Sequence, residues 1–359
     1  MAMNYISARE IAEKWGISQR RVAVLCAENR IKNAQMVGNM WIIPETAQKP
    51  DDARSTRYIN RNVDTKTIKP FLKWAGGKSQ LIKEIAEYYP FSTGVTKYAE
   101  PFVGGGAVLF DILDKYDLKE IYISDINKEL INAYEVVKNN VDELINQLTE
   151  MQNTYIVMGE ECRRKYYLAK RERFNSLKLK VNEIGNAEKA ALMIFLNKTC
   201  FNGLYRVNKK GLFNVPIGSY KKPLICDEVN LLAVSEKLRK VDIVHGSYET
   251  ASDFIDCNTF VYCDPPYRPI TDTSSFTAYT ENCFNDEEQI KLAGFVDLMD
   301  KRGAKIVVSN SDPKNYDQED NFFETLYKNY KIKRVEASRM INCKGTARSK
   351  IGELIISNF

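Results

Sequence analysis

The stretch Phe260–Tyr267, FVYCDPPY, is the part of the chain that best indicates the fold. An apolar run that ends at two prolines predicts a buried β-strand that stops at its carboxyl end. In open α/β sheets, ligands bind just outside such strand ends, so the side chain of Asp264 is placed to act on one. Because the residue before a proline favours extended geometry, Asp264 and Pro265 should present a carboxylate and a carbonyl in fixed directions.

Two acceptors and an aromatic ring follow this predicted strand, and they define a candidate catalytic set of Asp264, Pro265, Pro266 and Tyr267. The acceptors suit the two N–H groups of an exocyclic amine on a flat base. Tyr267 would stack on the heterocycle once the base leaves a duplex. The alternative is a strand that ends in an ordinary Asp-Pro-Pro turn, because a short motif on its own is weak evidence.

Composition bounds the class of protein. A chain of 359 residues predicts two or three domains, and a hydrophobic content of 44% is ample for a core. The formal net charge is only +5, so a nucleic-acid surface would have to be a local patch. No apolar run reaches membrane-spanning length, and we expect a cytoplasmic protein without a membrane partner. Eight cysteines without a CxxC pair and a single histidine, His245, predict no metal site.

Residues 5–44 predict a small helical unit at the N-terminus. Ser7 can cap a first helix, and Glu10 can complete a capping box with it. Ser18 can cap a second helix, after which residues 31–44 predict a hairpin. Residues 49–66 are polar and lack periodicity, so they predict a linker that follows a domain at 1–48.

This order of two helices and a hairpin resembles the winged helix-turn-helix of excisionase-like and MerR-like proteins, whose second helix enters the major groove. The resemblance implies that Arg20 and Arg21, in the first turn of the second helix, contact DNA. The alternative is a helical protein-interaction module on which both arginines are solvated.

A second cluster of motifs begins after the linker. Phe71–Lys78 is FLKWAGGK, and Tyr98–Phe110, YAEPFVGGGAVLF, predicts a strand, a glycine turn and a helix. Glycines allow close backbone approach to a ligand at an open helix N-terminus. The strand 120–124 ends in Asp125, about twenty residues beyond the glycines, where nucleotide-binding folds bond a ribose. The alternative is a Rossmann-like fold for a nicotinamide cofactor, but the loop lacks the G-x-G-x-x-G spacing.

With these motifs in this order, the chain from about Lys69 to Phe359 resembles the Dam-type class of DNA adenine-N6 methyltransferases. The resemblance implies S-adenosylmethionine as cofactor, S-adenosylhomocysteine as product and double-stranded DNA as substrate. It also implies that Asp125 takes the ribose and that Lys73 contacts DNA. The cofactor-binding residues that it implies are Trp74, Lys78, Glu100, Phe102, Gly104, Gly106, Asp125 and Asp264.

The fold that we expect is a seven-stranded, Rossmann-like methyltransferase sheet with an inserted target-recognition domain and the small N-terminal winged helix-turn-helix. The resemblance implies that the seventh strand is antiparallel. The expected catalytic domain is 67–141 with 232–359, and the insertion is 142–231. The predicted strands are 97–99, 120–124, 242–244, 259–263, 304–309, 332–337 and 353–357.

The insertion is too long for a loop and predicts helices at 160–177 and 187–196. After them, aromatic and basic residues interleave over 196–223, a composition suited to DNA, although a solvated surface ribbon would have the same composition. By the resemblance, Arg206 forks onto a guanine and Phe201 wedges into the base stack. The DNA-contacting residues implied here are Phe201, Asn202, Leu204, Arg206 and Pro216.

By the same resemblance, the expected target is the adenine of 5′-GATC-3′. We expect the enzyme to be a monomer. The enzyme would be a solitary methylase or the modification half of a restriction system with a cognate endonuclease. Two alternatives stay open: an amino methyltransferase acting on RNA or protein glutamine, and a DNA-binding regulator with an inactive or secondary methyltransferase domain.

Overall fold

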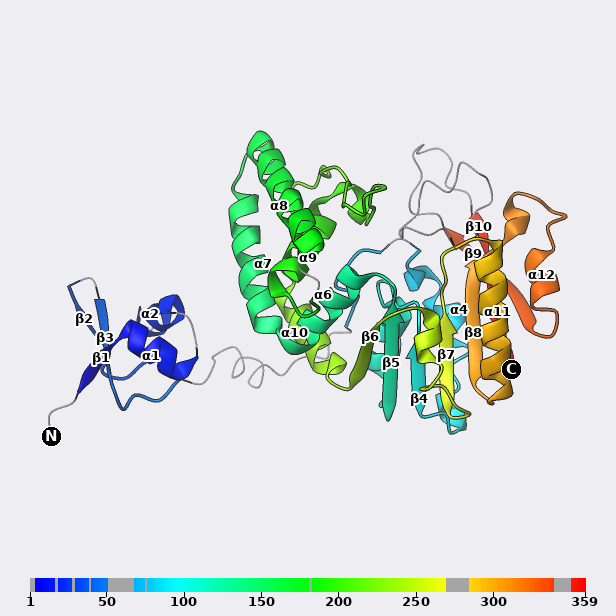
Figure 1. Cartoon of the computed structure of the whole chain (residues 1–359), viewed down its shortest axis with the longest axis horizontal. Coiled ribbons are helices and arrows are strands. Elements are labelled where there is room, and N and C mark those ends of the chain that lie inside the picture. The colour runs from blue at the N-terminus through cyan, green and yellow to red at the C-terminus, as the bar shows by residue number, and fades with distance from the viewer. Residues whose placement is uncertain are drawn as a thin grey trace. The chain divides into compact units, whose positions relative to one another are not determined.

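The computed structural model describes residues 4–16, 19–27, 30–38, 40–50, 68–74, 76–180, 183–268, 284–338 and 350–359. The chain divides into two compact units, Met1–Lys66 and Thr67–Phe359, and each is described by itself (Figure 1). Among the described residues, none of the helices combines the length and the apolar character that crossing a membrane requires.

The N-terminal unit packs two helices against a small antiparallel sheet. Helix α1 (Ala8–Trp15) starts at the predicted capping box: Ser7 Oγ accepts from Glu10 N at 3.3 Å, and Glu10 Oε2 accepts from Ser7 N at 2.8 Å. Helix α2 (Gln19–Ala27) follows, while its predicted cap, Ser18, lies outside the described residues. The hairpin is confirmed as β2 (Gln35–Val37) and β3 (Met40–Pro44). Strand β1 (Tyr5–Ser7), which pairs with β3, is not in our prediction.

The larger unit contains the seven predicted strands in one sheet. They are β4 (Lys97–Glu100), β5 (Glu120–Asp125), β6 (Val241–His245), β7 (Thr259–Cys263), β8 (Lys305–Ser311), β9 (Lys331–Ser338) and β10 (Lys350–Ser357). The order across the sheet is β6-β5-β4-β7-β8-β10-β9. Strands β4 to β8 pair in parallel, whereas β10 is antiparallel to both β8 and β9. The antiparallel seventh strand is therefore confirmed.

The larger unit contains helices on both faces of this sheet and in the insertion. They are α4 (Ile82–Ala86), α5 (Ala107–Lys115), α6 (Lys128–Asn139), α7 (Val141–Ile156), α8 (Glu160–Lys180), α9 (Ala187–Thr199), α10 (Glu228–Leu238), α11 (Asp286–Lys301) and α12 (Phe322–Leu326). Short 3₁₀ helices are η1 (Lys78–Gln80), η2 (Phe91–Thr93), η3 (Phe201–Gly203), η4 (Tyr248–Ala251) and η6 (Pro313–Asn315).

Strand β7 lies between two cores because it is buried on both faces, as expected for a central parallel strand. Phe260 and Tyr262 point into the core that contains α5 and α6, whereas Val261 and Cys263 point into the core under α11. This alternation fixes which residues of β7 face each core, and Asp264 is the first residue beyond the carboxyl end of the strand.

The insertion between β5 and β6 continues the first core away from the sheet. Figure 1 shows α7, α8 and α9 side by side. Helix α9 packs against α6, α7 and α8, so almost all of its side chains are buried. The predicted helices at 160–177 and 187–196 lie within α8 and α9, but we did not predict α7. Beyond α9 the chain folds back on itself through antiparallel bridges, Cys200 with Ile217 and Val207 with Phe213.

Candidate active site

Acidic side chains follow three neighbouring strands at the carboxyl edge of the sheet. Glu100 ends β4, Asp125 ends β5 and Asp264 follows β7, and these strands are adjacent in the sheet order. Glu100 is buried and accepts a hydrogen bond from Tyr98 Oη at 2.7 Å. Burial raises the pKa of Glu100 well above its usual value, and the nearby Asp264 and Asp125 raise it further. The edge of the sheet at which we expect ligands to bind therefore carries several neighbouring carboxyl groups.

The glycine turn wraps one of these acids. Gly104 and Gly106 have φ of 48° and 71°, in the left-handed region that glycine adopts without strain. Gly104 N donates to Asp125 Oδ2 at 3.1 Å, and Asn127 N donates to Oδ1 at 2.8 Å. Burial raises the pKa of Asp125 in spite of these two hydrogen bonds. A Cβ at Gly106 would lie 2.5 Å from the hydroxyl of Tyr134, so no larger residue fits the turn.

Two aromatic side chains flank the glycine turn. The indole of Trp74 lies so close that a Cβ at Gly104 would be 3.0 Å from its Cδ1 atom. Trp74 also stacks on Tyr205 of the insertion, with ring centroids 5.5 Å apart and an interplanar angle of 24°. On the side toward α11, Phe102 stacks on Tyr248 at 5.5 Å. The predicted cofactor residues Trp74, Phe102, Gly104, Gly106 and Asp125 thus lie around one turn.

Asp264 forms a buried ion pair with Lys78. Lys78 Nζ lies 2.6 Å from Asp264 Oδ1, and the lysine side chain is only 3% exposed. The ammonium also donates to the hydroxyl of Tyr267 at 2.9 Å and to the carbonyl of Gly76 at 3.0 Å. Tyr267 in turn donates to Glu353 Oε2 at 2.8 Å. The motif Asp264–Tyr267 is therefore held from two sides, by η1 and by β10.

The electrostatics of this group depend on Lys78. Burial raises the pKa of Asp264, and the negative charge of Glu353 adds to that effect. The Lys78 ammonium opposes both, because an adjacent cation stabilises the ionised form. Burial also raises the pKa of Tyr267, so its phenol stays protonated. The site can thus present one carboxylate, shielded by one ammonium, next to a neutral aromatic ring.

The FLKW segment and the insertion are joined by a buried asparagine. Asn197 Oδ1 accepts from Lys73 N at 2.8 Å, and Asn197 Nδ2 donates to the carbonyls of Lys73 and Gly203 at 2.8 and 2.9 Å. The ammonium of Lys73 lies 4.2 Å from the centre of the Tyr220 ring. Lys73 is therefore placed at the base of the expected DNA-contacting block.

The predicted DNA-contacting residues of the insertion lie on one exposed loop system. Phe201, Asn202, Arg206 and Pro216 are exposed, while Leu204 is half-buried. Phe201 N donates to the carbonyl of Pro216 at 2.9 Å, which brings these two residues together. Arg206 Nε donates to Asn214 Oδ1 at 2.8 Å, so the arginine is oriented from its own loop.

Two aromatic residues of this block are not available to contact DNA. Tyr205 and Phe213 are buried in the core rather than exposed among the lysines. The N-terminal Arg20 lies in α2 with Arg21, but the side chains of both are outside the described residues.

Sequence reasoning missed two polar residues of the site. Glu353 accepts from Tyr267, and Asn197 bridges Lys73 to Gly203. A signal exists for each, because Glu353 is an acid inside the apolar strand GELIIS and Asn197 ends the apolar helical run ALMIFLN. Within the described residues, no group of three or more His, Cys, Asp or Glu side chains could hold a metal ion.

Comparison with known proteins agrees with this geometry. The family model of the D12 class N6 adenine-specific DNA methyltransferases matches residues 74–341. The chain is 51% identical to the Type II methyltransferase M.MjaIII of Methanocaldococcus jannaschii, across 81% of this chain and 99% of that protein. It is 36% identical to the Type II methyltransferase M1.LlaDCHI of Lactococcus lactis subsp. cremoris, across 81% and 96% of the two chains.

A third relative carries the name DNA adenine methylase and comes from Escherichia coli. It is 34% identical, across 81% of this chain and 95% of its own length. The matched part contains the glycine turn, Asp125 and the Asp264–Tyr267 motif, which the structure brings to one edge of the sheet. This chain therefore belongs to the D12 class of N6 adenine-specific DNA methyltransferases, enzymes whose reaction implies S-adenosylmethionine as methyl donor and DNA as substrate.

Proposed function

We propose that this enzyme methylates N6 of an adenine that has been flipped out of double-stranded DNA, with Asp264 and Tyr267 receiving the base. One observation carries the proposal: the Asp264 carboxylate lies at the end of buried β7, beside Tyr267 and next to the strand ends that hold Glu100 and Asp125. The side chain of Asp264 is 20% exposed, so a base still stacked in a duplex could not reach it.

The chemistry requires orientation of a weak nucleophile. The lone pair of adenine N6 is delocalised into the ring, so the nitrogen must be held tetrahedral and in line with the methyl group. The Asp264 carboxylate and the Pro265 carbonyl accept the two amino hydrogens and stabilise the positive charge that develops on nitrogen. The Lys78 ammonium favours the ionised form of Asp264 and so opposes the burial that raises the pKa of this carboxyl group.

The residues around the glycine turn fit S-adenosylmethionine. Each oxygen of Asp125 uses one lone pair for a backbone N–H, which leaves a second lone pair to accept from a ribose hydroxyl. The missing side chain at Gly106 lets the turn pack directly against Tyr134 and Phe110, which holds Gly104 N on Asp125. When bound, the cofactor supplies an electrophilic methyl group on a sulfonium. The residues that we propose to line its site are Trp74, Lys78, Glu100, Phe102, Gly104, Gly106, Asp125 and Asp264.

We further propose that the insertion recognises the target sequence. The support is the set of exposed side chains on its loop, Phe201, Asn202, Arg206 and Pro216, together with the half-buried Leu204. Arg206 is the candidate for a guanine contact, and Phe201 for a wedge into the base stack. The proposed target is the adenine of GATC.

A cavity lined by lysines supports DNA binding at this side of the protein. It encloses about 380 Å³ between the FLKW segment and the insertion, and its wall includes Lys69, Lys73, Lys198 and Lys222. Burial lowers the pKa of Lys198 to about 8, and the adjacent charges of Lys73 and Lys69 contribute to that shift. Asp227 also lines the cavity and pairs with Lys69 at 3.1 Å, so it offsets part of this positive charge. The lysines outnumber it, and a backbone phosphate is the anion that duplex DNA offers them.

The N-terminal unit is proposed to be a second DNA-binding module. Its support is the order of α1, α2 and the β2–β3 hairpin, which is that of a winged helix-turn-helix. Arg20 and Arg21 lie in the first turn of α2, the helix that would enter the groove. We also propose that the enzyme acts as a monomer, with a cognate endonuclease as partner if it serves restriction.

A methyl-transfer assay with isotopically labelled cofactor tests the proposed function. Duplexes with GATC, duplexes with each base pair of that site replaced, total RNA and bulk protein would be offered at equal concentration. We expect label only in DNA, at N6 of adenine, and fastest in GATC. Label in RNA or in protein glutamine would contradict the substrate, and equal rates on all duplexes would contradict the target sequence.

A further inference from the structure

The residue that follows the catalytic motif, Arg268, binds two acids at once. Its Nε and Nη2 atoms donate to the two carboxylate oxygens of Asp286, at 2.6 and 2.9 Å, and its Nη1 atom donates to Asp320 at 2.5 Å. The centre of the guanidinium lies 4.2 Å from the Phe322 ring centroid. A planar fork with two carboxylates and a stacked ring has one preferred orientation, so the backbone at Arg268 is fixed in place.

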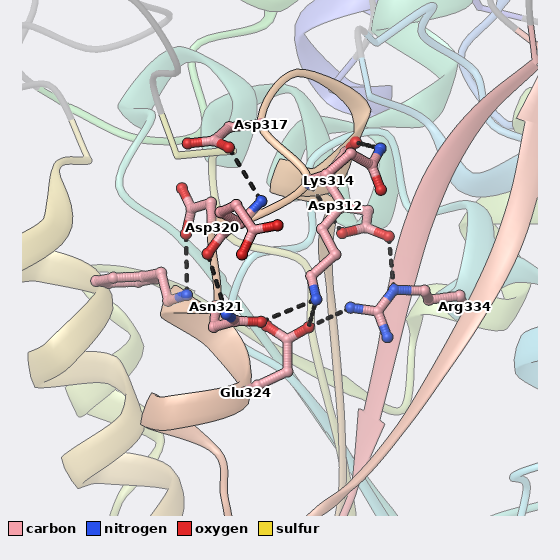
Figure 2. A network of polar contacts seen from close by, with 10 residues as sticks. Asp312, Lys314, Asp317, Asp320, Asn321, Glu324 and Arg334 are labelled. Atoms are coloured by element: carbon pink, nitrogen blue, oxygen red, sulfur yellow. Dashed lines mark hydrogen bonds and ion pairs between the residues drawn. The ribbon is translucent and has the colours of Figure 1, made fainter.

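The two acids belong to different elements, and both are anchored. Asp286 is the first residue of α11, and Asp320 lies just before α12. Burial alone would raise the pKa of Asp320, but hydrogen bonds from Phe322 N and Arg268 outweigh it and hold that pKa below its usual value. Figure 2 shows Asp320, which accepts from Phe322 N, beside a polar network in which Lys314 and Arg334 both contact Glu324. Arg268 therefore ties the motif to the start of α11 and to the segment just before α12.

A second set of hydrogen bonds holds the same loop at Pro266. Gln289 Nε2 donates to the carbonyl of Pro266 at 3.1 Å, and Asn310 Nδ2 donates to Gln289 Oε1 at 3.1 Å. Both amide side chains are buried, so this chain of hydrogen bonds is shielded from water. Gln289 is one helical turn beyond Asp286, and the first turn of α11 thus holds the backbone on both sides of Tyr267.

We propose that Arg268 is a positioning residue for methyl transfer, which sets the direction of the Tyr267 ring by clamping its backbone to Asp286 and Asp320. This inference rests on the proposed role of Tyr267 as the face that receives the base. At its far end, Tyr267 is held by its hydroxyl through Lys78 and Glu353. Those contacts alone would let the ring pivot about the hydroxyl, whereas the clamp fixes the other end. Arg268 touches neither the base nor the cofactor.

The test uses the full-length enzyme with Arg268→Met. Because the clamp acts on orientation and not on binding, we expect kcat on a GATC duplex to fall about tenfold, while KM for DNA and Kd for S-adenosylmethionine stay within about twofold of wild type. Arg268→Lys should recover part of kcat, since an ammonium can pair with one acid but cannot fork. The matched control is Arg302→Met, at the other end of α11, which should leave all three quantities unchanged. If Arg268→Met fails to fold, Asp286→Asn, which keeps its size and weakens the pair, serves in its place.

A double-mutant cycle separates the clamp from the proposed function. Tyr267→Ala alone should lose most of kcat, and wild-type turnover in that variant would overturn the role of Tyr267 itself. If Arg268 acts through Tyr267, then adding Arg268→Met to Tyr267→Ala should lower kcat no further. A full additional loss in the double variant, or wild-type kcat in Arg268→Met while Tyr267→Ala is impaired, would overturn the clamp and leave the proposed function standing.

Discussion

Asp264 is the residue whose removal should separate catalysis from DNA binding. Asp264→Ala removes one of the two acceptors for the adenine amino group, whereas the grip on DNA is distributed over many phosphate contacts. We expect turnover to fall by much more than tenfold, or more than about 1.4 kcal/mol in the barrier, with duplex affinity close to wild type. Single-turnover kinetics and a gel-shift titration measure the two quantities. Turnover within tenfold of wild type would contradict the catalytic role.

Asp125 should act on the cofactor rather than on the base. Asp125→Ala removes one charge-assisted pair of hydrogen bonds, so S-adenosylmethionine should bind more weakly by about 1.5 to 3 kcal/mol in titration calorimetry. The exposed Asp253 offers a control, since Asp253→Ala should bind normally. Burial raises the pKa of Asp125, so protonation sets in at a higher pH than for a free aspartate. Wild-type affinity for the cofactor should therefore weaken as the pH falls through that raised pKa, and Asp125→Asn should lose this dependence.

Arg206 gives a test of base recognition. If its guanidinium forks onto a guanine, Arg206→Ala should cost about 1 to 3 kcal/mol on GATC and relax preference at one base pair. A phosphate contact would instead weaken every duplex alike and make the salt dependence shallower. Competition between GATC and singly substituted duplexes at fixed salt separates the two. Asn214→Ala, which frees Arg206 from its partner in the loop, should give a smaller loss of the same preference.

At the scale of elements, the lysine-lined cavity makes DNA affinity depend on pH. The pKa of Lys198 is lowered to about 8, so its charge is present at pH 7 and is mostly lost by pH 9. DNA should therefore bind more weakly as the pH rises across this range. The slope of log affinity against log salt concentration should become shallower by about one unit, because one phosphate contact is lost. Lys198→Arg keeps its charge at pH 9, so its affinity should change less between the two pH values. Equal pH dependence of both proteins in a fluorescence titration would remove Lys198 from the DNA interface.

The elements of the sheet could be predicted because most strands, such as β5, β7 and β8, are short runs of largely apolar residues, while β9 alternates apolar and charged residues. Strand β7 shows why the place of the candidate site could be predicted as well: Asp264 directly follows this strand, so it lies at the carboxyl edge of the sheet. Helix α7 could also have been predicted, because Leu144, Leu148 and Met151 have the spacing of an amphipathic helix, but we made no prediction from that signal. Periodicity predicts which face of a helix or strand is apolar, but not which other element packs against that face.

The contacts that complete the site depend on residues distant in sequence. Tyr267 and Glu353 are 86 positions apart, and Lys73 and Asn197 are 124 apart. No local pattern specifies such pairs, because they follow from how the sheet and the insertion pack. The clamp on Arg268 is of the same kind, since Asp320 lies 52 positions away. Motifs therefore identified the acids and glycines that we propose to contact ligands, while the residues that orient them required the structure.

At the scale of the whole molecule, the two units should be separable. The N-terminal unit has a core of its own, which includes Ile11, Val22 and Ile43, and none of its described residues belongs to the buried clusters of the larger unit. We expect a protein lacking residues 1–66 to fold and to methylate a short GATC duplex at a rate within about threefold of the full chain. Circular dichroism melting and single-turnover kinetics measure folding and activity.

A slightly longer deletion provides the control for that experiment. Removing residues 1–74 also takes away Phe71 and Leu72, which are buried in the core of the larger unit, and Trp74, which lies against the glycine turn. Burial of two large apolar side chains contributes about 3 to 6 kcal/mol, a large part of the stability of a typical domain. The longer deletion should therefore unfold or lose activity while the shorter one does not. Loss of folding in both would show that the N-terminal unit is part of the methyltransferase, and not a separate module for DNA.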